Sequence, residues 1–261
     1  MLTLTFALQS LSTPLLLCVG LVSRAVAARP PMNDPFHRAA WRVVGVMFVV
    51  FGIDLFIGNI LQVLAFVDGT PSPALTFYLR VAPVLNHSRT FLALGGLAAL
   101  VVLAVLKAPP GPRYWRLAWA LLGVGLALGA VLGVIEGPFS ITGHLFAVVL
   151  WDVVELLVIL STLFVLLVTN RADRWLWALL AAYASGLALG IFGLQLLIRF
   201  GIGWNPPTWT IHAVRDFFYA TMLAAAFVRL RAARRGRPVH GMLGPDRAAV
   251  RDALSGATWR A

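Results

Sequence analysis

Ionisable side chains that could do chemistry stand inside the most apolar stretches of this chain. Near the C-terminal end, His212, Asp216 and Tyr219 recur at helical spacing, and Arg215 flanks the stripe that they form. An imidazole, a carboxylate and a guanidinium brought together in this way can transfer a proton or bind a charged group. Because ionisable groups are costly in apolar surroundings, they commonly mark a functional site.

Further ionisable groups occur in earlier apolar runs. His144 and Glu155 fall on one face of a predicted helix, and Asp152 lies beside that face. The other candidates in or beside apolar runs are Asp54, His87, Arg89 and Glu136. All of these, with Arg215 and Tyr219, are candidate ligand-binding residues, whereas His144, His212 and Asp216 are the candidates for catalysis if the protein is an enzyme.

The histidines also raise the question of a metal or a haem, because imidazole ligates zinc, copper and iron. His87, His144 and His212 are expected at similar depth, but no two of them share a helix at ligand spacing. The single cysteine, Cys18, can form neither an internal disulfide nor a thiolate metal cage. The sequence therefore leaves the metal and haem content open.

Composition indicates which solvent surrounds these groups. The chain of 261 residues is 60% hydrophobic and only 12% charged, which is too little polar surface to coat a water-soluble globule of that size. Its net charge of +11 could indicate nucleic-acid binding in a soluble protein, but the basic residues lie between and after the apolar runs. We therefore expect membrane lipids as partners and no nucleic acid.

Seven apolar stretches are long enough for helices that cross the hydrocarbon, which takes roughly 20 residues. They are residues 3–23, 41–66, 90–107, 115–135, 145–168, 175–198 and 208–229. Proline and glycine interrupt the chain between them. The sequence predicts an all-α polytopic membrane bundle of seven transmembrane helices in residues 1–230, followed by a basic cytoplasmic tail in residues 231–261.

Three smaller features accompany this bundle. Residues 74–88 mix apolar, aromatic and basic side chains, which predicts a short interfacial helix before the third span. In the tail, residues 244–246 read Gly-Pro-Asp, which is typical of a helix start and predicts a short amphipathic helix. Glycines at positions 123, 125, 129 and 133 have the spacing that lets membrane helices approach closely.

Basic residues predict the orientation, because cytoplasmic flanks of membrane proteins are enriched in Lys and Arg. Arginines gather in the first, third and fifth connections and in the tail, whereas Arg80, Arg89 and Arg199 flank the other side. We predict that the N-terminus lies outside and the C-terminus in the cytoplasm. The Ala, Arg, Gly and Leu bias, with Lys107 as the only lysine, is typical of a GC-rich genome and indicates a bacterial cytoplasmic membrane.

Depth along the helices, at about 1.5 Å per residue, puts nearly all the ionisable groups in the outer half of the bilayer and Asp54 near its midplane. This predicts an outward-facing polar cavity between the third, fifth and seventh spans. An alternative stays open, in which Arg89 or Arg215 pairs with Asp152 or Glu155 and the groups only hold the bundle together.

Two segments resemble the motifs of a known enzyme group. Residues 140–144, Ser-Ile-Thr-Gly-His, and residues 212–216, His-Ala-Val-Arg-Asp, are similar to the Ser-Gly-His and His-x-x-x-Asp motifs of lipid phosphate phosphatases and sphingomyelin synthases. The resemblance implies an outer-leaflet lipid-phosphate hydrolase or transferase, in which one histidine attacks phosphorus and the other, oriented by Asp216, moves the proton. Thr142 departs from the family's serine, and Pro206-Pro207 occupy the region of its phosphate-binding arginine.

Seven spans with Asp216 near the middle of the last one also resemble microbial rhodopsins. The lysine that holds their retinal would stand four residues later, where this chain has Ala220. The single lysine, Lys107, ends the third predicted span, so the sequence excludes a Schiff-base retinal.

The sequence is compatible with three functional hypotheses. The leading one is a sensor-like or ligand-binding membrane protein, which signals through a cytoplasmic or membrane partner because its tail is too short for an output domain. The second is the outer-leaflet lipid-phosphate enzyme. The third is an ion-coupled transporter that uses Asp54 and Asp216.

Overall fold

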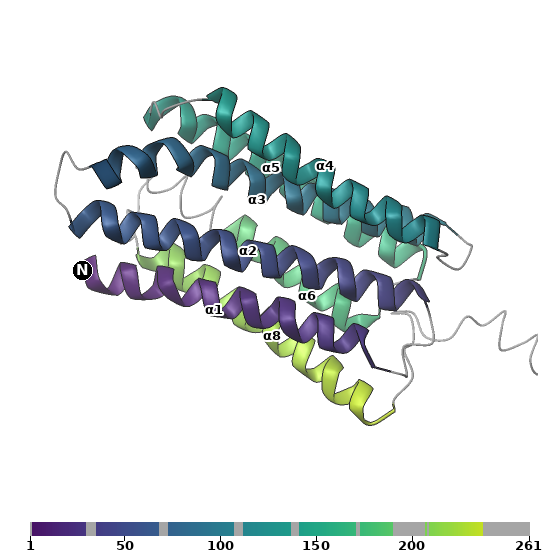
Figure 1. Cartoon of the computed structure of the whole chain (residues 1–261). Coiled ribbons are helices and arrows are strands. Elements are labelled where there is room, and N and C mark those ends of the chain that lie inside the picture. The colour runs from purple at the N-terminus through teal and green to yellow at the C-terminus, as the bar shows by residue number, and fades with distance from the viewer. Residues whose placement is uncertain are drawn as a thin grey trace, which may run out of the picture.

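The computed structural model describes residues 2–29, 35–67, 73–106, 112–136, 141–170, 173–189, 207 and 209–236. Within these ranges the chain forms seven helices and no extended strand (Figure 1). They are α1 (Leu2–Ala27), α2 (Pro35–Val67), α3 (Pro73–Val105), α4 (Pro112–Glu136), α5 (Ile141–Val168), α6 (Arg174–Gly186) and α8 (Trp209–Arg234).

Six of the described helices are long and apolar enough to cross a membrane. They contribute Ala7–Ala27, Phe36–Leu61, Arg80–Val105, Trp115–Glu136, Leu150–Val168 and Trp209–Arg234. The helix that begins with α6 is shorter and covers the apolar stretch Arg174–Leu189, three residues beyond the α-helical bound at Gly186. The rest of the predicted sixth span lies outside the described residues. The prediction of an all-α helical membrane bundle is confirmed, while the count of seven spans, the basic tail and its short helix stay predictions.

The segment 74–88 differs from its prediction. It does not form a separate interfacial helix, because α3 runs without interruption from Pro73 to Val105 and includes Pro83. A proline inside a helix removes only one main-chain hydrogen bond, and a neighbouring helix can support the site. Gly133 of α4 provides that support, since it packs directly against Pro83 and Val84.

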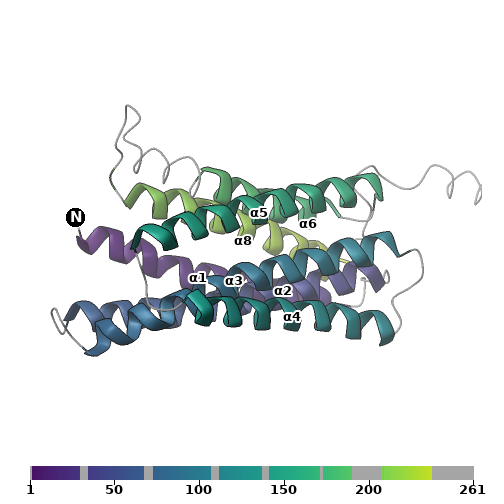
Figure 2. The same ribbon diagram turned by 90° about the horizontal axis from the view of Figure 1, so that it is seen from above.

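The helices form a closed ring. In order of contact, α3, α2, α1, α8, α6 and α5 each touch the next, α5 touches α3 again, and α4 packs on the outside against α3. Figures 1 and 2 show this arrangement from two sides, with α1 beside α8 and α4 beside α3. Segments far apart in the sequence therefore share one interior.

Glycine lets two helix pairs pack closely. A Cβ added to Gly129 of α4 would lie 2.6 Å from the carbonyl carbon of His87 in α3, and Gly125 is equally crowded by the backbone at Phe91. Gly20 of α1 has the same relation to α2, where the main-chain nitrogen of Val49 would lie 2.6 Å from an added Cβ. The predicted packing role of the α4 glycines is confirmed except at position 123, which has nothing within 4 Å.

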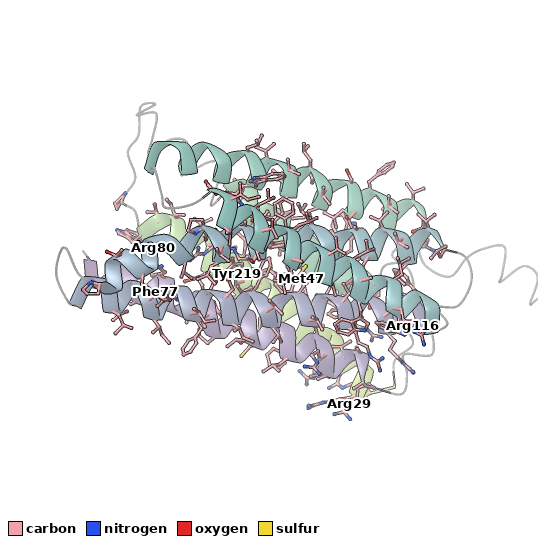
Figure 3. The ribbon with its side chains drawn as sticks, turned by 45° about the horizontal axis from the view of Figure 1, so that its top comes forward. Arg29, Met47, Phe77, Arg80, Arg116 and Tyr219 are labelled. Atoms are coloured by element: carbon pink, nitrogen blue, oxygen red, sulfur yellow. The ribbon has the colours of Figure 1, made fainter. Side chains whose placement is uncertain are left out.

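The two ends of the bundle differ in charge. Figure 3 shows Arg29 and Arg116 at one end, Phe77 and Arg80 at the other, and Tyr219 in the middle of the bundle. The end with Arg29 also receives the C-terminal turn of α8, which carries further arginines. The N-terminus lies at the less basic end (Figure 1).

Candidate functional site

A polar cavity of about 190 Å³ lies between α1, α2, α3 and α8, and it includes Gln9 near the start of α1. Its polar lining consists of Gln9, Asp54, Asn59, Asn86, Arg89 and Arg215. A polar cavity is thus present between the third and last helices, but the predicted contribution of the fifth span is wrong for this cavity, because α1 and α2 supply the rest of its lining. The reason is the ring order, which puts α1 and α2 between α3 and α8 on that side.

Arg89 is the central cation of this cavity, and its contacts are long. Its Nη1 lies 3.9 Å from Oδ2 of Asp54, and its Nη2 donates to Oδ1 of Asn86 at 3.5 Å. Charge-assisted hydrogen bonds usually measure about 2.7–2.9 Å, so within the described residues these contacts leave much of the guanidinium's donor capacity unused. Asp54 and Arg89 therefore meet at the cavity wall without closing it.

Two acidic residues of α5 lie behind Arg89 and not in the cavity. Asp152 and Glu155 are buried, and both are within electrostatic range of the Arg89 guanidinium. Glu155 also accepts a hydrogen bond from the hydroxyl of Tyr183 in α6. In the described contacts the ion pair of Arg89 is with Asp54, so the alternative of pairing with Asp152 or Glu155 stays a prediction.

Tyr183 was not among the residues singled out from the sequence for this role. Its ring packs edge to face against Phe48 at 5.3 Å and Phe51 at 6.2 Å between centroids. Its hydroxyl needs a hydrogen-bond partner when buried, and Glu155 provides it. A tyrosine within an apolar run usually needs a hydrogen-bond acceptor for its hydroxyl, which is the feature of the sequence that could have indicated the contact between Tyr183 and Glu155.

Arg215 of α8 organises the second part of the site. Its Nη2 donates to Oγ of Ser12 at 2.9 Å and lies 3.0 Å from Nδ1 of His212. Because a guanidinium can only donate, Nδ1 of His212 is the acceptor in this contact. The Ser12 hydroxyl in turn donates to Oδ1 of Asp216, and the Tyr219 ring centroid lies 5.9 Å from the guanidinium carbon.

The catalytic candidates are only partly brought together. In the described contacts His212 bonds to Arg215, and Asp216 accepts from Ser12, so a serine and an arginine stand where the motif expects a direct His–Asp bond. The side chain of His144 lies outside the described residues. The role of Ser12 could not be predicted from the sequence, because a single serine in an apolar helix belongs to no recognisable motif.

His87 and Glu136 form a separate pair outside the cavity. The imidazole Nε2 of His87 in α3 contacts Oε2 of Glu136 at the end of α4, which joins these two helices. In the part of the chain that the structure describes, no three His, Cys, Asp or Glu residues gather in a way that could hold a metal ion. Of the candidate histidines, His87 contacts Glu136 and His212 contacts Arg215, so these two imidazoles do not share a site.

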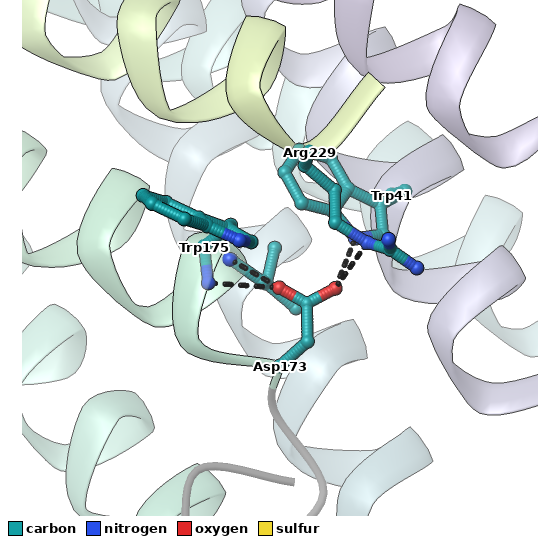
Figure 4. A network of polar contacts seen from close by, with 5 residues as sticks. Trp41, Asp173, Trp175 and Arg229 are labelled. Carbon is teal, nitrogen blue, oxygen red and sulfur yellow. Dashed lines mark hydrogen bonds and ion pairs between the residues drawn. The ribbon is translucent and has the colours of Figure 1, made fainter. Parts of the chain in front are cut away.

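A second polar cluster, missed by the sequence analysis, lies at the basic end and is shown in Figure 4. Asp173 caps α6 by accepting from the main-chain nitrogens of Trp175 at 2.9 Å and Leu176 at 2.8 Å. Its Oδ2 accepts from the Trp41 indole at 3.0 Å and from Nε of Arg229 at 3.2 Å. This Asp173 cluster joins α2, α6 and α8 in a fully buried setting.

The fold and the site define a class: a polytopic helical membrane protein with a charged cavity between four of its helices. No protein-family model, curated protein or solved structure matches this chain. Its function must be argued from the site alone.

Proposed function

We propose that this chain is a ligand-binding membrane protein that receives a small molecule with an anionic group in the cavity between α1, α2, α3 and α8. The supporting observation is the charge of the cavity lining, where Arg89 and Arg215 face a single carboxylate, Asp54. An anion that reaches this cavity exchanges its hydration for guanidinium donors, which are the preferred partners of carboxylates and phosphates.

The unused donors of both arginines support this choice. Arg89 reaches its two partners only at 3.5 and 3.9 Å. The Nε of Arg215 is buried and has no hydrogen-bond partner within the described residues, as is also true of the neighbouring acceptor Oδ2 of Asp216, which does not line the cavity. Buried polar groups are normally hydrogen-bonded, so an open cavity beside two incompletely bonded cations favours a bound acceptor group.

The charge difference between the two ends supports the predicted orientation. We place the basic end in the cytoplasm and the cavity towards the outer side of a bacterial cytoplasmic membrane. A ligand would then arrive from outside. A change of α8 on binding would carry the signal to a membrane or cytoplasmic partner, because Arg215 lies on the same helix as Arg229 near the basic end.

The test is binding to purified protein in nanodiscs, with Arg89→Gln compared with Arg80→Gln. Arg80 is exposed on the same helix and is absent from the cavity lining, so it controls for loss of charge. A panel of phosphate, sulfonate and carboxylate compounds is screened by thermal shift and titrated by calorimetry. We expect Arg89→Gln to weaken binding roughly tenfold to a hundredfold, as loss of a charged hydrogen bond does, and Arg80→Gln to leave it unchanged.

The proposal fails if no anion in the panel stabilises the parent protein, or if the two variants behave alike. The described contacts favour binding over the lipid-phosphate chemistry, since His212 bonds to Arg215, Asp216 accepts from Ser12, and no bond between His212 and Asp216 is among them. Ion-coupled transport keeps one supporting observation, the carboxylate of Asp54 at the cavity wall. Proteoliposomes that show no pH-dependent or sodium-dependent flux would remove it.

A further inference from the structure

An apolar groove of about 490 Å³ adjoins the cavity on the outer surface of α1 and α2. Leu17 of α1 and Phe56, Ile60, Val63 and Leu64 of α2 supply most of its walls. Phe56, Ile60 and Leu64 are between 43% and 53% exposed, so the groove is open to the surroundings of the bundle. In a membrane those surroundings are lipid chains.

Asn59 belongs to both spaces, because it lines the polar cavity and the apolar groove. Its Nδ2 donates to Oγ1 of Thr13 at 3.2 Å and to the main-chain oxygen of Gln9 at 3.3 Å. The Nε2 of Gln9 donates back to Oδ1 of Asn59 at 3.0 Å. Gln9 lines the cavity and Thr13 the groove, so one layer of amide and hydroxyl groups separates the two.

Size indicates that the two spaces act together. Ligand sites usually measure about 300–1,000 Å³. The cavity alone, at about 190 Å³, is small for such a site, whereas the groove, at about 490 Å³, lies within that range by itself and also together with the cavity. A molecule that fills both must be polar at one end and apolar at the other.

Charge indicates which polar end fits. Arg89 and Arg215 outnumber Asp54 among the residues that line the cavity. The groove is lined mainly by apolar side chains, and its polar members are Ser10, Thr13 and Asn59. We propose that the ligand is an anionic amphiphile of the membrane, with its acidic headgroup between the two arginines and its chain along the groove of α1 and α2. This inference rests on the proposed function and names its ligand class.

In this arrangement Asn59 contacts the junction between headgroup and chain. Its amide can exchange a bond to Gln9 or Thr13 for one to an ester or hydroxyl oxygen of the ligand at little cost. The ligand would reach the cavity from the side, through the lipid, and not only from the aqueous face. The acidic group could be a phosphate or a carboxylate, because a guanidinium binds both.

The test uses three probes that share parts of one structure: a single-chain alkyl phosphate, the short soluble methyl phosphate, and a single-chain alcohol of the same length without the phosphate. Binding is measured on the full chain in detergent micelles by native mass spectrometry and thermal shift. We expect the alkyl phosphate to bind at least about tenfold more tightly than either of the other probes, since both ends contribute.

Two tryptophan substitutions separate the groove from the cavity. Ile60→Trp fills the groove, whereas Leu157→Trp on the exposed face of α5 adds the same bulk elsewhere. We expect Ile60→Trp to reduce the affinity for the alkyl phosphate to that for methyl phosphate while binding of methyl phosphate persists, which also shows that the variant is folded. Leu157→Trp should change neither.

The outcomes distinguish this inference from the proposed function. If methyl phosphate binds as tightly as the alkyl phosphate and Arg89→Gln weakens both, the cavity binds anions but the amphiphile proposal is wrong. If the alcohol binds as tightly as the alkyl phosphate, the groove holds bulk lipid only and the proposal is wrong. If no probe binds and Arg89→Gln has no effect, both proposals fail. Where the alkyl phosphate binds as expected, the same titration with an alkyl carboxylate of equal chain length identifies which acidic group the cavity prefers.

Discussion

Replacing Asp173 by alanine tests whether the buried cluster at the basic end holds the bundle together. The substitution removes the cap of α6, which costs about 1 kcal/mol. It also leaves the Arg229 guanidinium, 2% exposed, without its carboxylate. Removing one partner of a buried ion pair costs about 3–5 kcal/mol, so we expect a total loss of about 4–6 kcal/mol.

Asp173→Asn separates the two contributions. The asparagine keeps an acceptor oxygen for the main-chain nitrogens of Trp175 and Leu176, so α6 stays capped. Its amide nitrogen would then face two donors, the Trp41 indole and Nε of Arg229. We therefore expect Asp173→Asn to lose the ion-pair contribution of about 3–5 kcal/mol while retaining the cap.

The measurement is equilibrium unfolding in mixed micelles, followed by tryptophan fluorescence and circular dichroism. Arg229→Gln and Arg231→Gln form the matched control pair, because Arg231 is exposed on the same helix. Arg231→Gln should stay within about 0.5 kcal/mol of the parent. If Asp173→Ala also stays within about 1 kcal/mol of the parent, the cluster is not a stabilising contact and the reasoning from burial is wrong.

Two further predictions test the packing and the orientation. Gly129→Ala should destabilise the bundle by about 1–3 kcal/mol, because its Cβ would meet the α3 backbone. Gly123→Ala should be near neutral in the same unfolding assay, because nothing lies within 4 Å of an added Cβ there. Equal effects of the two substitutions would contradict the close approach of α3 and α4. In a Cys18→Ser background, Arg234→Cys should react with a membrane-impermeant maleimide only after the cells are opened, and labelling of intact cells would reverse the proposed orientation.

The helices themselves could be predicted from the sequence, because a run of apolar residues long enough to cross lipid has few alternatives. The close approach of α4 to α3 was also predictable from the glycines near 129, since small residues have no other obvious role at that spacing. The helix ends were less predictable. α3 begins at Pro73 and passes through Pro83, although proline usually marks a boundary, because α4 packs across the site.

The neighbours in the ring could not be predicted. A helix that is apolar on all sides does not reveal which side faces lipid and which faces protein, so the sequence offers no order for the helices. The sequence therefore predicts a cavity between the third, fifth and seventh spans, although α1 and α2 take the place of the fifth span in its lining. Ser12 and Asn59 matter only because α1 packs beside both α8 and α2, a relation between segments far apart in the chain.

The two polar clusters argue for different roles because of the space around them. Asp173 accepts four hydrogen bonds and is 3% exposed, so the acceptor capacity of its carboxylate is used. The cluster fits a structural role, although the buried Nη2 of Arg229 has no partner within the described residues. Arg89 borders an open cavity and reaches its partners only at 3.5 and 3.9 Å. Natural selection for stability alone would be expected to tighten such contacts or replace them by apolar packing. The long contacts of Arg89 at an open cavity therefore support the proposed binding of an anionic ligand there, whereas the short contacts of Asp173 do not suggest a ligand.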